Sequence, residues 1–471
     1  MAGIGSLLSI ARTALAVQQQ AVTVSGHNVA NATTEGYTRQ RISLTPSSPE
    51  VRPDGIFGTG VRVAGVERLR DSLLDQQVRA SAAPAEGAGT RRDALSRIET
   101  ILGAGTNSSI GTALDQFWNA WSDLATNPAA TSSRSVVQQR GAGLAATFNR
   151  QANQLDALEL QLRDDAQTQL AQLNTFAKQI ADLNVSIVSE EAAGGVANDL
   201  RDQRDMLIDK VAAIVPVTVI DRPNGANQVM IGGMPLVDGV STRTLTLTGP
   251  TPLGVRFGAS AEASRISGGR LGGLVDAVNA DIAGARAALD ALAAGVVADV
   301  NALHVRGWSP PAGASGNWDP TLGPTGSGIN FFGAASPGAL TARGMALGAE
   351  VQASAAAITA SDTLNAVGNN AIALGMAGLR TNAPSATTGS FGGAFDALVN
   401  RFALAAEGAA SDAQVHDTLR QQATARRNAV SGVSTDDELV TLIQHQQAYV
   451  AASRLVTTIN DMAQTILDMK R

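Results

Sequence analysis

Apolar residues near both ends of the chain recur at alternating spacings of four and three residues. This spacing places them along one side of a helix that packs against another helix. The N-terminal stripe consists of Ile4, Leu8, Ala11, Leu15, Val22 and Val29, with polar Gln18 and Ser25 between them. The C-terminal stripe consists of Leu442, Tyr449, Ala452, Val456, Ile459 and Ile466, with polar His445 among them. We predict two terminal helices that pair as a coiled coil, with the rest of the chain inserted between them.

A helical period of apolar positions continues through most of the interior of the chain. It predicts helices over residues 71–82 and 91–102, a third between the Asn107-Ser108-Ser109 capping signal and Asn127-Pro128, and others over 133–191, 199–214, 272–304 and 391–431. The last helix is expected to begin at Ser434, where three acidic residues suit a helix N-terminus. The 133–191 helix is typical of an elongated bundle or rod, and Leu144 and Asp164 are its candidate break points.

The period drops to two in a shorter region, residues 215–264. Val215, Val217 and Val219 alternate with polar neighbours, and the turn signal Pro223-Asn224-Gly225 follows them. Such alternation around a turn predicts a small β insertion of the meander type. Residues 41–70 contain two further extended stretches bounded by glycines, which we interpret as a short extended linker.

Glycine, proline and alanine dominate residues 307–390. Their density disfavours regular structure, and we interpret this segment as a loop or a reduced outer domain. The predicted fold class is therefore mainly α with a small β insertion, in an elongated multi-domain protein. The predicted domains are a terminal coiled-coil domain (1–40 with 432–471), the linker (41–70), a helical rod or bundle (71–216, 265–306 and 391–431), the β insertion (215–264) and the loop segment (307–390).

Composition narrows the function classes. The 471-residue chain has a formal net charge of −6, which does not favour binding to nucleic acid or to an anionic membrane. It contains no cysteine, so thiolate chemistry and disulfides are excluded. No apolar run approaches the roughly 20 residues that span a bilayer. Because the N-terminal segment has no basic region before its apolar part, we expect no cleaved signal peptide.

Candidate catalytic groups are sparse. The four histidines, His27, His304, His416 and His445, show no helical metal-site spacing, and we interpret them as surface or stripe residues. The adjacent pairs Asp164-Asp165 and Asp436-Asp437 point in different directions on helices, which favours solvated faces over a catalytic dyad. Trp118 and Trp121 are expected in the core. We therefore predict no enzymatic activity, no cofactor and no metal.

One sequence motif is distinctive. Residues 28–41, NVANATTEGYTRQR, resemble the N-terminal signature shared by bacterial flagellar rod, hook and hook-associated proteins. The candidate assembly motif consists of Asn28, Ala30, Asn31, Thr34, Gly36, Tyr37, Thr38, Arg39 and Gln40. The TRQ continuation, the 58–79 stretch GTGVRVAGVERLRDSLLDQQVR and the closing segment 431–471 are similar specifically to the hook-associated protein 1 (FlgK) family. Further landmarks are Arg204-Asp205, GGRLGGL from Gly268, and Asn330-Phe331-Phe332. The chain departs from this family between Phe332 and Phe391, where many members carry a larger outer β domain.

The resemblance implies a structural subunit at the junction between hook and filament. It also implies that the paired terminal helices of this subunit form an inner domain that lines a channel. It implies termini that are disordered in the free monomer, export in an unfolded state without a cleaved signal peptide, and polymerisation through those termini in the extracellular flagellum. Its implied partners are other copies of the chain, the hook protein, a second junction protein on the filament side, a cytoplasmic export chaperone that binds the C-terminal segment, and the export apparatus.

Two alternatives remain open at this stage. The chain could be a hook or rod subunit, although such relatives usually lack the TRQ continuation and the long helical middle. It could also be a secreted enzyme or adhesin whose activity lies in the β insertion, although about 50 residues are few for a catalytic domain.

Overall fold

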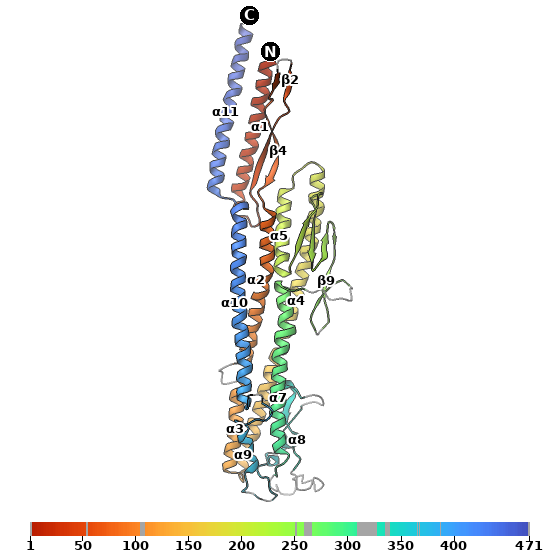
Figure 1. Ribbon diagram of the computed structural model, residues 1–471, viewed down its shortest axis with the longest axis vertical. Coiled ribbons are helices and arrows are strands. Elements are labelled where there is room, and N and C mark those ends of the chain that lie inside the picture. Colours follow the sequence, from red (N-terminus) through yellow and green to blue (C-terminus); the bar gives the residue numbers. More distant parts are fainter. Residues whose placement is uncertain are drawn as a thin grey trace.

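The computed structural model is an elongated molecule whose first and last helices lie side by side at one end (Figure 1). It describes residues 2–52, 55–103, 109–249, 252–258, 266–308, 327–334, 340–364, 366, 368–386 and 388–469. Long helices run along the molecular axis, and small antiparallel sheets lie against them. The predicted class, mainly α with a small β insertion, is confirmed.

The elements follow the chain in this order. The helices are α1 (Ala2–Ala30), α2 (Ser72–Leu102), α3 (Ile110–Thr126), α4 (Thr131–Ala192), α5 (Asn198–Ile214), α6 (Gly269–Asp276), α7 (Ala283–His304), α8 (Ala349–Ala353), α9 (Ala371–Gly378), α10 (Phe391–Ser431) and α11 (Thr435–Asp468). The strands are β1 (Gln40–Pro46), β2 (Glu50–Arg52), β3 (Gly55–Phe57), β4 (Val61–Arg68), β5 (Thr218–Asp221), β6 (Asn227–Ile231), β7 (Met234–Asp238), β8 (Ser241–Thr242), β9 (Leu245–Leu247), β10 (Val255–Phe257), β11 (Phe332–Ala334) and β12 (Met345–Leu347). A π-helical stretch, Ala277–Ile282, joins α6 to α7.

Side-chain caps fix where several helices begin. Each capping oxygen accepts a hydrogen bond from a backbone N–H in the first turn, which would otherwise lack a partner. The caps are Asp71 for α2, Ser109 for α3, Ser390 for α10 and Ser434 for α11. The other two residues of the predicted α3 signal, Asn107 and Ser108, lie outside the described residues.

Helix α2 corrects one prediction, because residues 71–82 and 91–102 belong to a single helix that contains Pro84. The sequence suggested a break at its proline and glycines. Packing overrides this preference, since the small residues around Gly87 let α6 approach closely: a Cβ atom on Gly273 would lie 2.6 Å from the Gly87 carbonyl oxygen. Helix α4 is unbroken, and its 62 residues span about 93 Å.

An aromatic cluster forms the core at the end of the molecule far from the termini. Phe117 and Trp121 of α3 are fully buried, and Trp118 is almost so, as the sequence predicted. The Phe117 ring centroid lies 5.4 Å from that of Phe331 and 5.6 Å from that of Phe332. These distances are typical of favourable aromatic pairs.

His304 lies in this same core, so its prediction as a surface or stripe residue was wrong. Its side chain is fully buried, and its ring centroid is 5.4 Å from that of Phe331. Nδ1 donates to the Ile329 carbonyl at 2.7 Å, and Nε2 accepts from the Thr359 N–H at 3.1 Å. Burial lowers the pKa of His304 to about 4. The neutral ring therefore joins α7 to two later segments.

Parts of the Gly, Pro and Ala-rich region fold against this core. Strands β11 and β12 pair antiparallel, with Phe332 opposite Leu347. Of the aromatic residues in this region, Phe331 and Phe332 are fully buried and Trp308 is also buried, whereas Trp318 lies outside the described residues. Small side chains make this region look irregular in the sequence, but they allow short turns to pack closely on α4 and α7.

The β insertion contains a four-stranded meander in the order β5-β6-β7-β8 and a separate hairpin of β9 and β10. Asp221 pairs with Asn227 across the predicted turn, and Gly225 in that turn has φ of +85°. A positive φ of this kind favours glycine.

Five asparagines, four on α-helices and Asn279 in the π-helical stretch, each hold a residue at or just before the start of a strand in one recurring way. The Nδ2 of each asparagine donates to the backbone carbonyl of one partner residue, and its Oδ1 accepts from the backbone N–H of that partner. A neighbouring strand would make the same pair of hydrogen bonds. The pairs are Asn28 with Gln40, Asn174 with Leu245, Asn184 with Asn227, Asn279 with Leu253, and Asn301 with Phe332, at 2.7–3.0 Å. We call these pairs asparagine clamps, and each attaches the start of a short strand to a helix.

Candidate functional site

Helices α1 and α11 form the terminal helix pair, which lies side by side at one end of the molecule (Figure 1). Of the predicted N-terminal stripe, Ala11 is buried and Leu8, Leu15, Val22 and Val29 are half-buried, while the Ile4 side chain lies outside the described residues. Of the C-terminal stripe, Ile459 is buried, Leu442, Ala452 and Val456 are half-buried, and Tyr449 and Ile466 are 40% and 46% exposed. The polar stripe positions meet, because Gln18 Oε1 and His445 Nδ1 lie 2.8 Å apart.

Helix α1 has a second partner that the sequence did not predict. Strands β1 and β4 of the 41–70 segment pair antiparallel and pack against α1, as Figure 1 shows. Val17, Ala21 and Asn28 are buried on α1 although they lie outside the predicted stripe. The segment is thus a β-hairpin supporting α1.

Helix α11 buries very little of its surface. Among the described side chains of its 34 residues, only Glu438 and Ile459 are buried. Large apolar side chains are exposed along it: Leu439, Val440, Ile443, Val450, Leu455, Met462, Ile466 and Leu467. We call this set the outer face of α11. So many exposed apolar side chains along one helix are typical of an interaction surface.

The motif residues gather where α1 ends and the loop to β1 begins. They are Asn28, Ala30, Asn31, Thr34, Gly36, Tyr37, Thr38, Arg39 and Gln40. Ala30 is exposed at the last turn of α1, while Asn28, Thr38 and Gln40 are buried. Together with the acidic residues of α5 and the α10–α11 corner, this region is the polar junction.

Asn28 is the centre of the polar junction. Besides clamping Gln40, its Nδ2 donates to Glu438 Oε2 of α11 at 3.0 Å, across 410 residues of sequence. Its Oδ1 also accepts from the Tyr37 hydroxyl at 2.7 Å, and that hydroxyl lies 3.0 Å from His27 Nδ1. One amide therefore connects the end of α1, the motif loop and the last helix.

Arg39 makes the second link to α11. Its Nε donates to Glu438 Oε1 at 2.6 Å, so each carboxylate oxygen of Glu438 accepts from one motif residue. Glu438 is only 2% exposed, and charge-assisted hydrogen bonds to a buried carboxylate are among the stronger polar contacts. The Arg39 N–H also donates to the Ser431 carbonyl at the end of α10.

The motif loop itself is held by local turns. The Asn31 side chain donates to the His27 carbonyl and accepts from Thr34 Oγ1 at 3.2 Å. Gly36 has φ of +79°, and a Cβ atom there would lie 3.3 Å from the Met206 side chain. A residue with a side chain would therefore be strained at Gly36 and would crowd α5.

Helix α5 receives the other side of the motif. The Thr38 N–H donates to Asp202 Oδ2 at 2.9 Å, and Gln40 Nε2 donates to Asp199 Oδ1 at 3.0 Å. Asn198 donates to the Gln40 side chain at 3.3 Å. Burial raises the pKa of Tyr37, and the nearby carboxylates of Asp199, Asp202 and Glu438 raise it further. Its hydroxyl therefore remains a donor.

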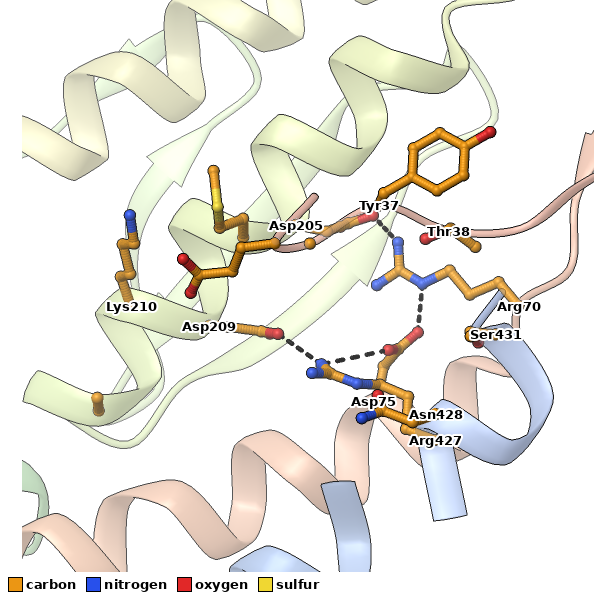
Figure 2. A pocket seen from close by; sticks show the side chains of 15 residues that line it. Tyr37, Thr38, Arg70, Asp75, Asp205, Asp209, Lys210, Arg427, Asn428 and Ser431 are labelled. Carbon is orange, nitrogen blue, oxygen red and sulfur yellow. Dashed lines mark hydrogen bonds and ion pairs between the residues drawn. The ribbon is translucent and has the colours of Figure 1, made fainter. Parts of the chain in front are cut away.

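The same helix binds a group of arginines from β4, the loop after β4, α2 and α10, and Figure 2 shows two of them, Arg70 and Arg427. The ion pairs are Arg68 with Asp202 and Asp205, Arg70 with Asp75 and Asp205, Arg79 with Asp205 and Asp209, and Arg427 with Asp75 and Asp209. Arg70, Asp75, Asp205, Asp209 and Arg427 line a cavity of about 320 Å³, together with Tyr37 and Thr38 of the motif. The polar junction thus joins α1, the hairpin, α2, α5, α10 and α11.

Sequence reasoning found the motif but missed these partners. Asp199, Asp202, Asp205 and Asp209 recur at spacings of three and four, which places them on one face of α5. That charged face, on a helix with an apolar side of its own, was the available signal. Glu438 was interpreted only as part of an acidic N-terminal cluster.

The arrangement suits holding segments together more than reaction chemistry. Among the described residues, no group of three or more histidine, aspartate and glutamate side chains is placed to bind a metal ion. No helix within the described ranges has both the length and the hydropathy needed to cross a bilayer.

Comparisons with known proteins point to one family. Residues 95–317 match the family model of the helical domain of the flagellar hook-associated protein FlgK, and residues 427–469 match that of the C-terminal region of the flagellar basal body rod proteins FlgEFG.

Flagellar hook-associated protein 1 of Bacillus subtilis is 38% identical over 227 residues, which are 47% of this chain and 45% of that protein. Its counterpart in Salmonella typhimurium is 30% identical over 345 residues, which are 70% of this chain and 60% of that protein. The chain thus spans about half of the length of these relatives. The solved flagellar hook junction protein FlgK from Burkholderia pseudomallei has a similar fold, with a TM-score of 0.62 at 18% identity over 76% of this chain and all of that one.

Proposed function

Because the chain belongs to the flagellar hook-associated protein 1 (FlgK) family, we propose that it is a structural subunit of the junction between the hook and the filament of a bacterial flagellum. The outer face of α11 carries this proposal. A helix of 34 residues with two buried side chains is stable only if further surfaces cover it. Neighbouring subunits of an axial assembly supply those surfaces.

We propose that the neighbours are further copies of the chain, the hook protein on one side and a second junction protein on the filament side. The exposed apolar residues of α11 support polymerisation through the terminal helices, since apolar contact is the main driving force of association. The small buried surface of the terminal helix pair supports its disorder in the free monomer, because ordering entropy would exceed the burial that one pair provides. Residues 1–40 and 432–471 then form the inner domain and residues 71–431 the outward domains.

The proposal includes export. A chain with disordered ends passes through the flagellar export apparatus unfolded, with a cytoplasmic chaperone on its C-terminal segment. The exposed apolar outer face of α11 is the surface that such a chaperone would cover. The final location is the extracellular flagellum, without contact to nucleic acid or membrane.

The test places one charge on the outer face of α11. Leu455, which is 43% exposed, is replaced by Asp, and the matched control is Leu160→Asp at a 65% exposed position of α4. Both proteins are expressed in a strain that lacks the native subunit. We expect Leu455→Asp to abolish swimming and to be absent from purified hook–basal bodies, with unchanged melting of the soluble protein, while Leu160→Asp assembles.

Normal assembly of Leu455→Asp would contradict polymerisation through α11. Hydrogen exchange of the wild-type monomer provides a second test: we expect α1 and α11 to exchange within seconds, and the assembled form to protect them. We expect immunolabelling to find the protein at the distal end of the hook. Labelling along the whole hook would favour the hook or rod alternative.

A further inference from the structure

A second cleft lies between α2, α5 and the β insertion. Its volume is about 540 Å³. Six arginines line it: Arg68, Arg70, Arg79, Arg201, Arg204 and Arg222. Three carboxylates also line it, those of Asp75, Asp205 and Asp221. This density of guanidinium groups is unusual in a chain with a negative net charge.

Five of the six arginines have carboxylate partners. These are Asp202 and Asp205 for Arg68, Asp75 and Asp205 for Arg70, Asp205 and Asp209 for Arg79, Glu191 for Arg201, and Asp238 for Arg222. The ion pairs neutralise these side chains within the fold.

Arg204 differs from the others. It is 2% exposed, and its NH1 donates to Asn184 Oδ1 at 2.9 Å and to the Gly225 carbonyl at 2.7 Å. No ion pair to Arg204 occurs among the described residues, and its buried Nε has no hydrogen-bond partner there. A buried guanidinium without a counter-charge is costly.

Charges of both signs surround Arg204. Burial is the main reason that its pKa falls to about 9, and the charges of Arg201, Arg68 and Arg70 lower it further, whereas Asp221 is the carboxylate that opposes them. Arg79 is also more than nine-tenths buried, and its NH2 lacks a hydrogen-bond partner among the described residues. Two buried arginines of the cleft lining thus each keep one guanidinium nitrogen without a hydrogen bond within the described part of the chain, although Arg79 NH2 lies 3.5 Å from Asp205 Oδ1.

A purely structural role for Arg204 explains only part of this. Its NH1 fixes the turn of the β insertion to α4 and α5, but a neutral amide would donate there without burying a charge. Guanidinium groups match oxyanions, with several donors in one plane. We propose that this cleft binds a small oxyanion, of the phosphate or sulfate type, which accepts hydrogen bonds from Arg204 and Arg79 and joins the β insertion to α2 and α5.

This proposal does not rest on the proposed function, because the cleft lies between α2, α5 and the β insertion, although Arg68, Arg70 and Arg79 also belong to the polar junction. The test uses the full chain and inorganic phosphate, with sodium chloride at matched ionic strength as the reference. We expect phosphate to raise the melting temperature saturably by about 2 °C beyond chloride, since a ligand that binds only the folded state stabilises it. Sulfate should act similarly. The same measurement with acetate distinguishes a site for tetrahedral anions from a site for carboxylates.

Three variants make the test specific. Arg204→Gln removes the buried charge and should abolish the phosphate response. Gln76→Glu places a carboxylate at an exposed position of the cleft lining, so it should also abolish the response and should raise the melting temperature without phosphate. Arg163→Gln removes an arginine of α4 that pairs with Glu159 outside the cleft, so its response should equal that of the wild type.

The proposal is overturned if phosphate has no saturable effect beyond chloride. It is equally overturned if Gln76→Glu responds as the wild type does, and this holds even where Arg204→Gln fails to fold. Isothermal titration of phosphate into wild-type protein and Gln76→Glu gives the direct readout, with binding heat expected only in the former.

Discussion

The terminal helix pair and the helical body, which comprises α2–α5, α7 and α10 with the segments packed on them, both consist of long helices but are stabilised differently. Helix α3 buries eight of its 17 residues, including three large aromatic ones, whereas α11 buries two of its 34. The body therefore contains its own apolar core. The terminal pair depends on a polar junction at one end and leaves apolar side chains exposed along its length. Equal helical periodicity in a sequence thus does not imply equal burial.

The largest contrast is expected from large-to-small substitutions in the two regions. Phe117→Ala removes a fully buried ring that contacts Trp118, Trp121, Phe331 and Phe332. It should lower the free energy of unfolding by about 3–5 kcal/mol, measured by urea denaturation. Leu455→Ala on the outer face of α11 should change it by less than about 0.5 kcal/mol. Similar losses in both variants would break the comparison.

The body should also respond to mild acid. The pKa of buried His304 is about 4 in the folded state, below the ordinary value of 6.5. Because the unfolded chain then binds a proton more readily, the stabilisation is fully present above pH 6.5 and is lost as the pH falls toward 4. We expect a loss of up to about 3 kcal/mol over this window in unfolding experiments.

A matched pair of variants assigns that acid response. His304→Gln should be less stable at neutral pH and should show a weaker pH dependence between 6.5 and 4. His416→Gln, on the half-buried surface of α10, should keep the wild-type slope. An unchanged slope in His304→Gln would show that other groups cause the loss.

The terminal pair should respond to its polar junction. Glu438→Gln removes the charge that Arg39 and Asn28 bind, and it should weaken the closure of α11 on α1 by about 1–3 kcal/mol. Hydrogen exchange in α11 of the assembled form, where we expect the pair to be ordered, should accelerate, while the melting temperature of the body in the monomer stays unchanged. Glu407→Gln, an exposed position of α10, serves as the control. Unchanged exchange would mean that the apolar stripe alone holds the pair.

The smallest predicted effect concerns glycine-to-alanine substitutions in α1 and α10. A Cβ atom on Gly26 would meet nothing within 4 Å, and the same holds for Gly408 in α10. Gly26→Ala and Gly408→Ala should each favour their helix by about 0.5–1 kcal/mol. Circular dichroism of the monomer should show a gain in helix for Gly26→Ala only, because α10 is already ordered by its packing. An equal gain from both would place α10 among the marginal helices.

Sequence periodicity predicted the helices that are long and strongly amphipathic. Residues 391–431 and the start at Ser434 agree with α10 and α11, since a glycine at 432 and a serine cap mark the boundary. The proline in α2 misled the prediction because the compensating contact comes from α6, almost 190 residues away. Local rules do not contain such information.

Only half of the polar junction could be predicted from the sequence. The motif residues stood out as a group, but their partners on α5 and α11 are 158–410 residues distant in sequence. The asparagine clamps were not predictable at all, because an asparagine within a helix is a weak helix former whose role depends on which strand end passes beside it.

The link between Asn28 and Glu438 also has a consequence for the timing of synthesis. Glu438 is added to the chain 410 residues after Asn28, which at bacterial translation rates is a delay of roughly 20–80 s. During this interval the first helix has no last helix to bind, while the body can form its own core. The nascent chain therefore keeps its N-terminal segment free of its most distant partner for the whole of that time.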